Sequence, residues 1–162
     1  MKVIILALGL LALASAVIKL DPETRRMIDD YGRERIFHGT NVVFKGEPWI
    51  PITDHFDPFL SFSEEDMQYL KDWGLNTIRL GVMWPGVAPT ADRFNKTYIE
   101  EIEKLVYTAG SKYGIYSLID FHQDVLAARF CGEGIPEWAV RQDVEGFLDF
   151  PFPLKWAYPL NN

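Results

Sequence analysis

The chain has 162 residues, with 16 basic and 23 acidic side chains, a formal net charge of −7, 48% hydrophobic residues and one cysteine. The apolar content is too high for an intrinsically disordered chain, and the negative charge excludes a protein that follows nucleic acid by neutralising phosphates. A single cysteine excludes a disulfide framework and a thiolate metal cage.

The first sixteen residues are predicted to be a secretory signal peptide. Lys2 supplies a positive charge, the run from Val3 to Ala14 is apolar, and small residues follow it at the expected cleavage site. A membrane-spanning helix needs about 20 apolar residues, so an uncleaved anchor is the weaker alternative. The prediction is a signal peptide at 1–16 and a mature portion at 17–162, with no transmembrane segment after cleavage and a secreted or lysosomal location.

Two later positions bear on the secretory route. Asn95 opens the triplet Asn-Lys-Thr, an acceptor for N-glycosylation, and is a candidate glycosylation site. Cys131 is expected to pair or react in an oxidising compartment, but the chain offers it no second cysteine.

The first strand–helix unit of the mature portion is predicted from β-branched, aromatic and capping residues. Residues 35–44 are typical of a strand, and the turn signal at 45–48 ends it. Residues 63–66 resemble a capping box and start a helix, which stops at Gly74.

The second unit and a third strand follow at similar spacing. Residues 76–83 predict a strand, 84–95 a loop, and 99–109 a helix with an apolar stripe that Gly114 closes; a strand at 115–122 comes next. Strands that alternate with helices form a parallel sheet through right-handed crossovers, so the fold class is α/β.

The three strands share a polar face that points to one kind of α/β fold. Asn41, Arg79 and His122 lie opposite the apolar rows of their strands, and Asp124 continues the polar row of the third. A doubly wound sheet is more often apolar on both faces. Polar groups at the inward carboxyl ends are typical of a (β/α)₈ TIM barrel. We therefore predict the first three strand–helix units of such a barrel, incomplete in this chain.

Each polar residue also has a purely structural interpretation. Arg79 fits an ion-paired arginine, His122 a satisfied core histidine, and Asp120 and Asp124 the caps of a loop. The convergence of three strands at one rim favours a polar site over these readings. His122 and Asp124 are a metal-ligand pair, but two ligands on one strand do not define a site, so we predict no metal and no cofactor.

Four runs of sequence carry a resemblance to a known family. They are FHGTN at 37–41, LNTIRLGVMWPG at 75–86, DFHQD at 120–124 and GEGIPEW at 132–138. Together they resemble the amino-terminal part of endoglycoceramidases, which are members of the cellulase-like glycoside hydrolase family 5. The similarity extends over nearly all of the mature portion.

The resemblance implies a retaining β-glycosidase that cleaves between the oligosaccharide and the ceramide of glycosphingolipids, or acts on another β-glycoside. By resemblance, Arg79 matches the arginine that holds the nucleophilic carboxylate, His122 a histidine lining the subsite of the cleaved sugar, and Asp124 an aspartate of the sugar-binding loop. Asn41 and Trp84 complete the candidate substrate-binding set. Tryptophan stacks on apolar sugar faces or lipid chains, although burial in a loop core is its commoner fate.

The resemblance also implies two catalytic glutamates, an acid/base and a nucleophile, which are expected beyond Asn162. Glu133, Glu137 and Glu145 match loop positions instead. A full barrel takes about 250 residues. We therefore expect the 162-residue chain to be an inactive fragment, unstable because open sheet edges remain uncovered.

Two other functions remain open from the sequence. One is a non-catalytic module that binds glycolipid through Arg79, His122 and Asp124, which ligand affinity without hydrolysis would favour. The other is a related β-glucanase, which a panel of substrates would distinguish from a glycosphingolipid hydrolase.

Overall fold

The computed structural model describes residues 18–124, 126–128 and 132–140. The chain divides into two compact units, Met1–Ile36 and Phe37–Asn162. The predicted signal peptide, Cys131 and Glu145 lie outside the described residues.

The described part of the first unit is a small antiparallel pair of strands. β1 (Lys19–Leu20) pairs with β2 (Met27–Ile28). Asp29 follows β2, is 3% exposed and accepts hydrogen bonds from the backbone and the guanidinium of Arg33. Neither strand is predicted from the sequence, because two residues are too few to show a period of two.

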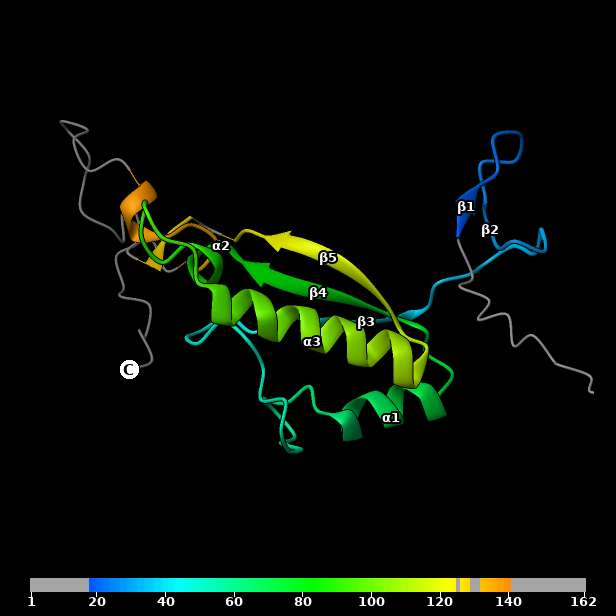
Figure 1. Cartoon of the computed structure of the whole chain (residues 1–162), viewed down its shortest axis with the longest axis horizontal. Helices are drawn as coiled ribbons and strands as arrows, with labels where there is room; N and C mark the ends of the chain where they lie inside the picture. Colours follow the sequence, from blue (N-terminus) through cyan, green and yellow to red (C-terminus); the bar gives the residue numbers. More distant parts are fainter. Residues whose placement is uncertain (1–17, 125, 129–131, 141–162) are drawn as a thin grey trace, which may run out of the picture. The chain divides into compact units, whose positions relative to one another are not determined.

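The second unit alternates strands and helices, as Figure 1 shows. Its elements in chain order are β3 (Gly39–Val42), α1 (Glu64–Asp72), β4 (Thr77–Met83), α2 (Trp84–Val87), α3 (Lys96–Tyr113), β5 (Tyr116–His122) and the 3₁₀ helix η2 (Glu137–Ala139). The three strands form a parallel sheet in the order β3-β4-β5. The predicted α/β class and parallel sheet are confirmed, and the central strand is the one with the longest apolar row.

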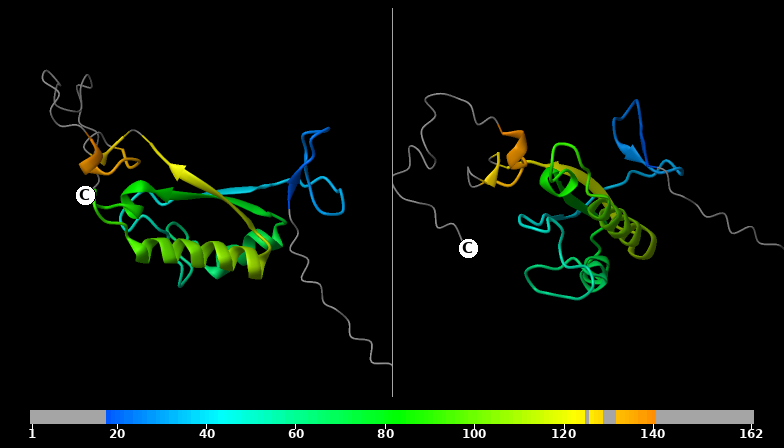
Figure 2. Two further views of the ribbon diagram at one scale, coloured as in Figure 1. Left: turned by 45° about the horizontal axis from the view of Figure 1, so that its top comes forward. Right: turned by 60° about the vertical axis from the view of Figure 1, so that its left-hand side comes forward.

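The two long helices cover one face of this sheet, which Figure 2 shows from the side. Ile78 and Leu80 of β4 are fully buried under them. The buried residues that form this core with them come from both helices and the flanking segments: Phe62, Met67, Leu70, Tyr98, Ile102, Leu105, Ala109 and Ile115. The face opposite the helices is therefore the one that carries the polar residues of the strands.

Capping residues fix where the helices begin. The Ser63 backbone N–H donates to the Asp66 carboxylate over 2.7 Å, so the predicted capping box forms at α1. Asn95 caps α3, with its side-chain oxygen accepting from the backbone N–H of Tyr98. Gly114 ends α3 in the left-handed conformation, at φ +70°, which favours glycine.

Two predicted boundaries were wrong. The strand predicted at 35–44 is shortened to Gly39–Val42, because its flanks do not pair with β4. The segment predicted as a loop at 84–95 begins with the short helix α2, which tolerates Pro85 because a first-turn N–H has no partner within the helix.

Tyr98, at the start of α3, is linked by hydrogen bonds of its side chain to the carboxyl end of β4 and to Trp49. Its hydroxyl accepts from the Met83 backbone N–H over 3.0 Å and donates to the Trp49 carbonyl over 3.1 Å. Burial raises the pKa of this phenol. The end of β4, where the candidate site begins, is thus held by a buried side-chain bridge.

Among the helices of the described residues, none combines the length and apolar character that crossing a bilayer requires.

Candidate functional site

Asp120 joins two of the predicted site residues on the open face of the sheet. Its Oδ2 lies 2.9 Å from Nη2 of Arg79 and 2.7 Å from Nδ1 of His122. A carboxylate that is paired with a guanidinium can only accept hydrogen bonds, so Nδ1 of His122 carries a proton. The structure therefore brings Arg79 and His122 together through one shared carboxylate.

The other ring nitrogen of His122 is buried and lacks a partner. The side chain is 10% exposed, and Nε2 has no hydrogen-bond partner among the described residues. Oδ2 of Asp124 lies 3.8 Å from Nε2. In the neutral imidazole with a proton on Nδ1, Nε2 is an acceptor that the protein leaves for a ligand.

A lysine links Asp124 to a glutamate from a later loop. Nζ of Lys45 forms ion pairs with the carboxylates of Asp124 and Glu133, the second at 2.7 Å. The hydrogen bond to Asp124, followed by the one to Glu133, raises the pKa of Lys45. The hydrogen bond from Lys45 lowers the pKa of Asp124. Lys45 and Asp124 are therefore charged at neutral pH, and the ammonium group lies between the Asp124 and Glu133 carboxylates beside His122.

We refer to six residues as the Asp120 cluster: Lys45, Arg79, Asp120, His122, Asp124 and Glu133. Glu133 reaches this cluster because its loop folds back on the end of β5. The Glu133 backbone N–H donates to the Asp124 carbonyl over 3.2 Å, and the Gly134 N–H donates to the Leu126 carbonyl over 2.9 Å. A Cβ on Gly134 would lie 2.6 Å from the Asp124 nitrogen and from the Gln123 Cα. Only a glycine permits this approach without displacement of the loop.

Asn41 lies on the same face of the sheet, one strand away. It is exposed and stands opposite Arg79 in the pairing of β3 with β4. An open hollow of about 340 Å³ lies here. Its lining residues are Gly39, Thr40, Asn41, Thr77, Ile78, Arg79 and Leu118.

Trp84, also predicted in the substrate-binding set, packs elsewhere. Its ring centroid lies 6.1 Å from that of Phe121 and 5.6 Å from that of Trp138, edge to face in the second case. Trp138 is anchored in turn by an N–H bond to the Ala88 carbonyl. Successive residues of a strand point to opposite faces, so Phe121 lies across β5 from Asp120 and His122. The structure does not bring Trp84 into the polar cluster, because an aromatic group on the other face engages it.

Three residues of the cluster were not among the predicted site residues. Asp120 was placed with His122 on the polar face of its strand, with a loop cap as the structural alternative, but it was not included in the site. Glu133 was interpreted as a loop position. Lys45 carries no local signal, because it lies 79 positions from Asp124 in the sequence.

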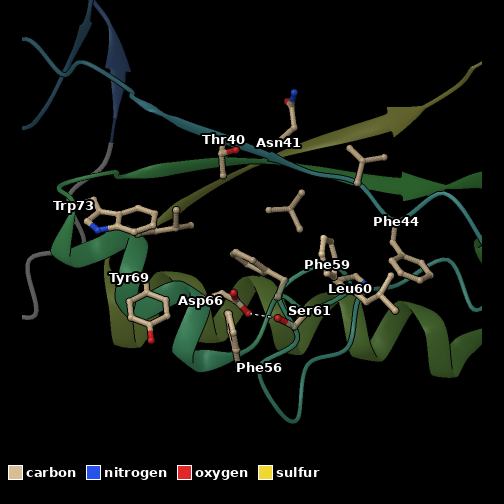
Figure 3. A pocket seen from close by; sticks show the side chains of 15 residues that line it. Thr40, Asn41, Phe44, Phe56, Phe59, Leu60, Ser61, Asp66, Tyr69 and Trp73 are labelled. Atoms are coloured by element: carbon tan, nitrogen blue, oxygen red, sulfur yellow. Dashed lines mark hydrogen bonds between the residues drawn. The ribbon is translucent and has the colours of Figure 1, made fainter.

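A second cavity, of about 480 Å³, lies between β3 and α1. Figure 3 shows Thr40 pointing into it and Asn41 pointing away, to the other face of β3. Aromatic side chains dominate its lining, among them Phe56, Tyr69 and Trp73. Most of the lining is apolar and the cavity belongs to the helix-covered face, so it is separate from the Asp120 cluster.

Residues 38–149 match the family model for cellulase, glycosyl hydrolase family 5. The chain is 54% identical over 149 residues to an endoglycoceramidase of Cyanea nozakii and 51% identical over 144 residues to one of Hydra vulgaris. These alignments cover 91% and 89% of this chain, but 29% and 27% of the relatives. Endo-glycoceramidase II from Rhodococcus sp., in complex with a five-membered iminocyclitol, superposes with a TM-score of 0.61 at 26% identity, covering 78% of this chain and 28% of that structure.

Proposed function

The chain belongs to glycosyl hydrolase family 5 and forms the first strand–helix units of an incomplete (β/α)₈ barrel, and from this premise we propose that the protein hydrolyses the bond between oligosaccharide and ceramide in glycosphingolipids. The names of its relatives and the resemblance of the four sequence runs support this substrate class. Because the chain spans less than a third of those relatives, the activity is proposed for a protein that also supplies the catalytic glutamates.

The shared carboxylate of Asp120 is the observation that supports the proposal most. A retaining glycosidase needs a nucleophilic carboxylate that stays ionised and keeps one orientation. A guanidinium beside such a carboxylate lowers its pKa and fixes its position. Arg79 is held by Asp120 yet remains 42% exposed, so its guanidinium still has donors for a second carboxylate.

The remaining residues of the cluster suit the hydroxyl groups of a sugar. Nε2 of His122 accepts a hydrogen bond, Asp124 accepts further ones, and Lys45 donates. A hydroxyl both donates and accepts, so alternating charged partners can satisfy several hydroxyls of one ring. Hydrogen bonds of this kind lower the barrier when they strengthen in the transition state.

Hydrolysis of a fluorescent glycosphingolipid tests the proposal. We expect turnover by the longest polypeptide that the reading frame encodes and none by residues 17–162 alone, since two carboxyl groups must flank the scissile bond. Turnover of β-glucans in place of glycosphingolipid would favour the related β-glucanase. Absence of glycosphingolipid turnover by the longest polypeptide would contradict the proposed activity.

A glycolipid-binding module without catalysis is the second candidate function. It is favoured by one observation, namely that the Asp120 cluster is complete within residues 45–133. Saturable binding of glycolipid by every polypeptide tested, with no hydrolysis by any of them, would select this function.

We also propose that the protein enters the secretory pathway and carries a glycan on Asn95. The Oδ1 atom of Asn95 caps α3, which leaves its amide nitrogen for a glycan. Asn95→Asp keeps the helix cap and removes the amide that accepts the glycan. The secreted variant should therefore lose the glycan mass that glycosidase treatment removes from the wild type. The melting temperature of the unglycosylated protein should stay the same. Asn95→Gln should lose the mass and about 1 kcal/mol of stability. An unchanged mass in secreted Asn95→Asp would contradict the assignment.

A further inference from the structure

Three side chains at the carboxyl end of β5 have the chemistry of a metal site. One ligand atom each from His122, Asp124 and Glu133 lies within 4.8 Å of the other two. One imidazole nitrogen and two carboxylate oxygens are the donor set that zinc accepts in proteins. The sequence alone offered two of these ligands, and the loop that folds back over β5 supplies the third.

The unpartnered nitrogen of His122 points to a ligand beyond the protein. Nε2 is buried, the side chain is nine-tenths buried, and Nε2 faces Asp124 at 3.8 Å. Asp120 accepts the proton of Nδ1 from the other side of the ring. This carboxylate–histidine arrangement is the one that fixes the tautomer of metal-binding histidines and makes Nε2 a stronger donor of its lone pair.

Lys45 is the competitor for this position. Its ammonium group already pairs with both carboxylates, but its side chain is 46% exposed. It can therefore swing into solvent without leaving a cavity behind. A bound metal ion would replace one positive charge with two and would also engage Nε2 of His122, to which Lys45 makes no hydrogen bond.

We propose that His122, Asp124 and Glu133 bind a divalent transition metal ion such as zinc, in place of the Lys45 ammonium group. Metal binding at this site does not depend on the proposed hydrolysis, because it needs only His122, Asp124 and Glu133 and none of the expected catalytic glutamates. A metal ion bound there occupies the position where sugar hydroxyls would meet Nε2, so metal and sugar exclude one another.

Calorimetric titration of the purified protein with zinc chloride tests the proposal. We expect one ion per chain, weakening of more than about tenfold in His122→Gln, and tightening in Lys45→Met. His55→Gln is the matched control, since His55 pairs with Asp54 on the surface, and its affinity should equal that of the wild type. Equal affinity in His122→Gln and wild type, or binding by Lys45→Met alone, would overturn the proposal.

A nitrogen-15 NMR spectrum of the wild type decides the case if a variant fails to fold. The chain has three histidines, so their ring signals can be assigned individually. Zinc should shift Nε2 of His122 and leave His38 and His55 in place. A shift confined to either of those two, or no shift up to about 1 mM zinc, would contradict the site.

Discussion

Asp120 is the residue on which the polar cluster depends. It accepts from Arg79 and from His122 at the same carboxylate oxygen, so it fixes the position of a cation and the tautomer of an imidazole together. Its own side chain is 18% exposed, so water competes little for these bonds. Asp120 in this way determines how Arg79 and His122 are presented on the open face of the sheet.

Asp120→Asn should lower kcat/KM of the active polypeptide by about 10- to 100-fold, because a hydrogen bond to a charged group contributes about 1.5–3 kcal/mol. Nitrogen-15 NMR should show His122 losing its uniform Nδ1–H form in the variant. Asp72→Asn is the control with the same charge change, on the exposed end of α1. If Asp120→Asn keeps both the tautomer and the rate, Asp120 does not position these groups.

The path of the backbone determines which side chains can meet at the site. The loop after β5 is the clearest example, because it brings Glu133 to Lys45. Gly134 packs against the backbone of Gln123 and Asp124, and this contact carries Glu133 toward Lys45. The Cβ distance of 2.6 Å is shorter than real contacts permit, so any side chain must displace the loop.

Gly134→Ala should therefore destabilise the protein by about 1–3 kcal/mol and release Glu133 from Lys45. Gly46→Ala is the matched control, since a Cβ there would meet nothing within 4 Å. Chemical denaturation of the two variants, made in the longest polypeptide that the reading frame encodes, measures the difference. Equal midpoints would show that the loop does not pack as described.

The pair of helices has its own pH-dependent contact. Glu64 of α1 bonds Lys112 and Tyr113 of α3, and the hydrogen bond from Lys112, followed by that from Tyr113, lowers the pKa of Glu64 below its ordinary value of 4.5. A lowered folded-state pKa contributes stability above pH 4.5 that is lost as the pH falls through the folded value.

Glu64→Gln should accordingly flatten the fall in stability of the wild type below about pH 4.5. Glu100→Gln, on the exposed side of α3, should leave that fall unchanged. Denaturant midpoints of the longest encoded polypeptide and its variants from pH 3 to 7 would measure both. Parallel curves for Glu64→Gln and wild type would refute the contact.

The elements were more predictable than the cluster, for a physical reason. The apolar stripes of α3 and β4 are local periodic patterns, and a capping box marked the start of α1, so the parallel α/β unit followed from neighbours in sequence. The pairing of Lys45 with Asp124 and Glu133 depends on chain reversal over many residues, which no local pattern encodes. Trp84 lies outside the cluster because it packs against Phe121, a contact with another strand that no local pattern encodes.

At the scale of the whole molecule, the described parallel sheet has two outer strands, β3 and β5, and β5 carries apolar side chains at the surface. Leu118, Ile119 and Phe121 of β5 are 63%, 52% and 63% exposed. Open edges and exposed apolar side chains favour association over a stable monomer. We therefore expect this sheet to associate unless its edges and the apolar side chains of β5 are covered.

Residues 17–162 alone should accordingly unfold without a sharp transition and associate with rising concentration. Differential scanning calorimetry with light scattering would measure both. A sharp, concentration-independent transition would show that three strands and two long helices suffice.

The most direct test of a carbohydrate site at Asp120 is a nitrogen-15 NMR titration of the histidine rings with lactose, a soluble β-linked disaccharide. The ring signals of His122 should move saturably while those of His38 and His55 stay in place. If His122 does not respond, or if all three histidines move alike, the cluster does not bind sugar as proposed.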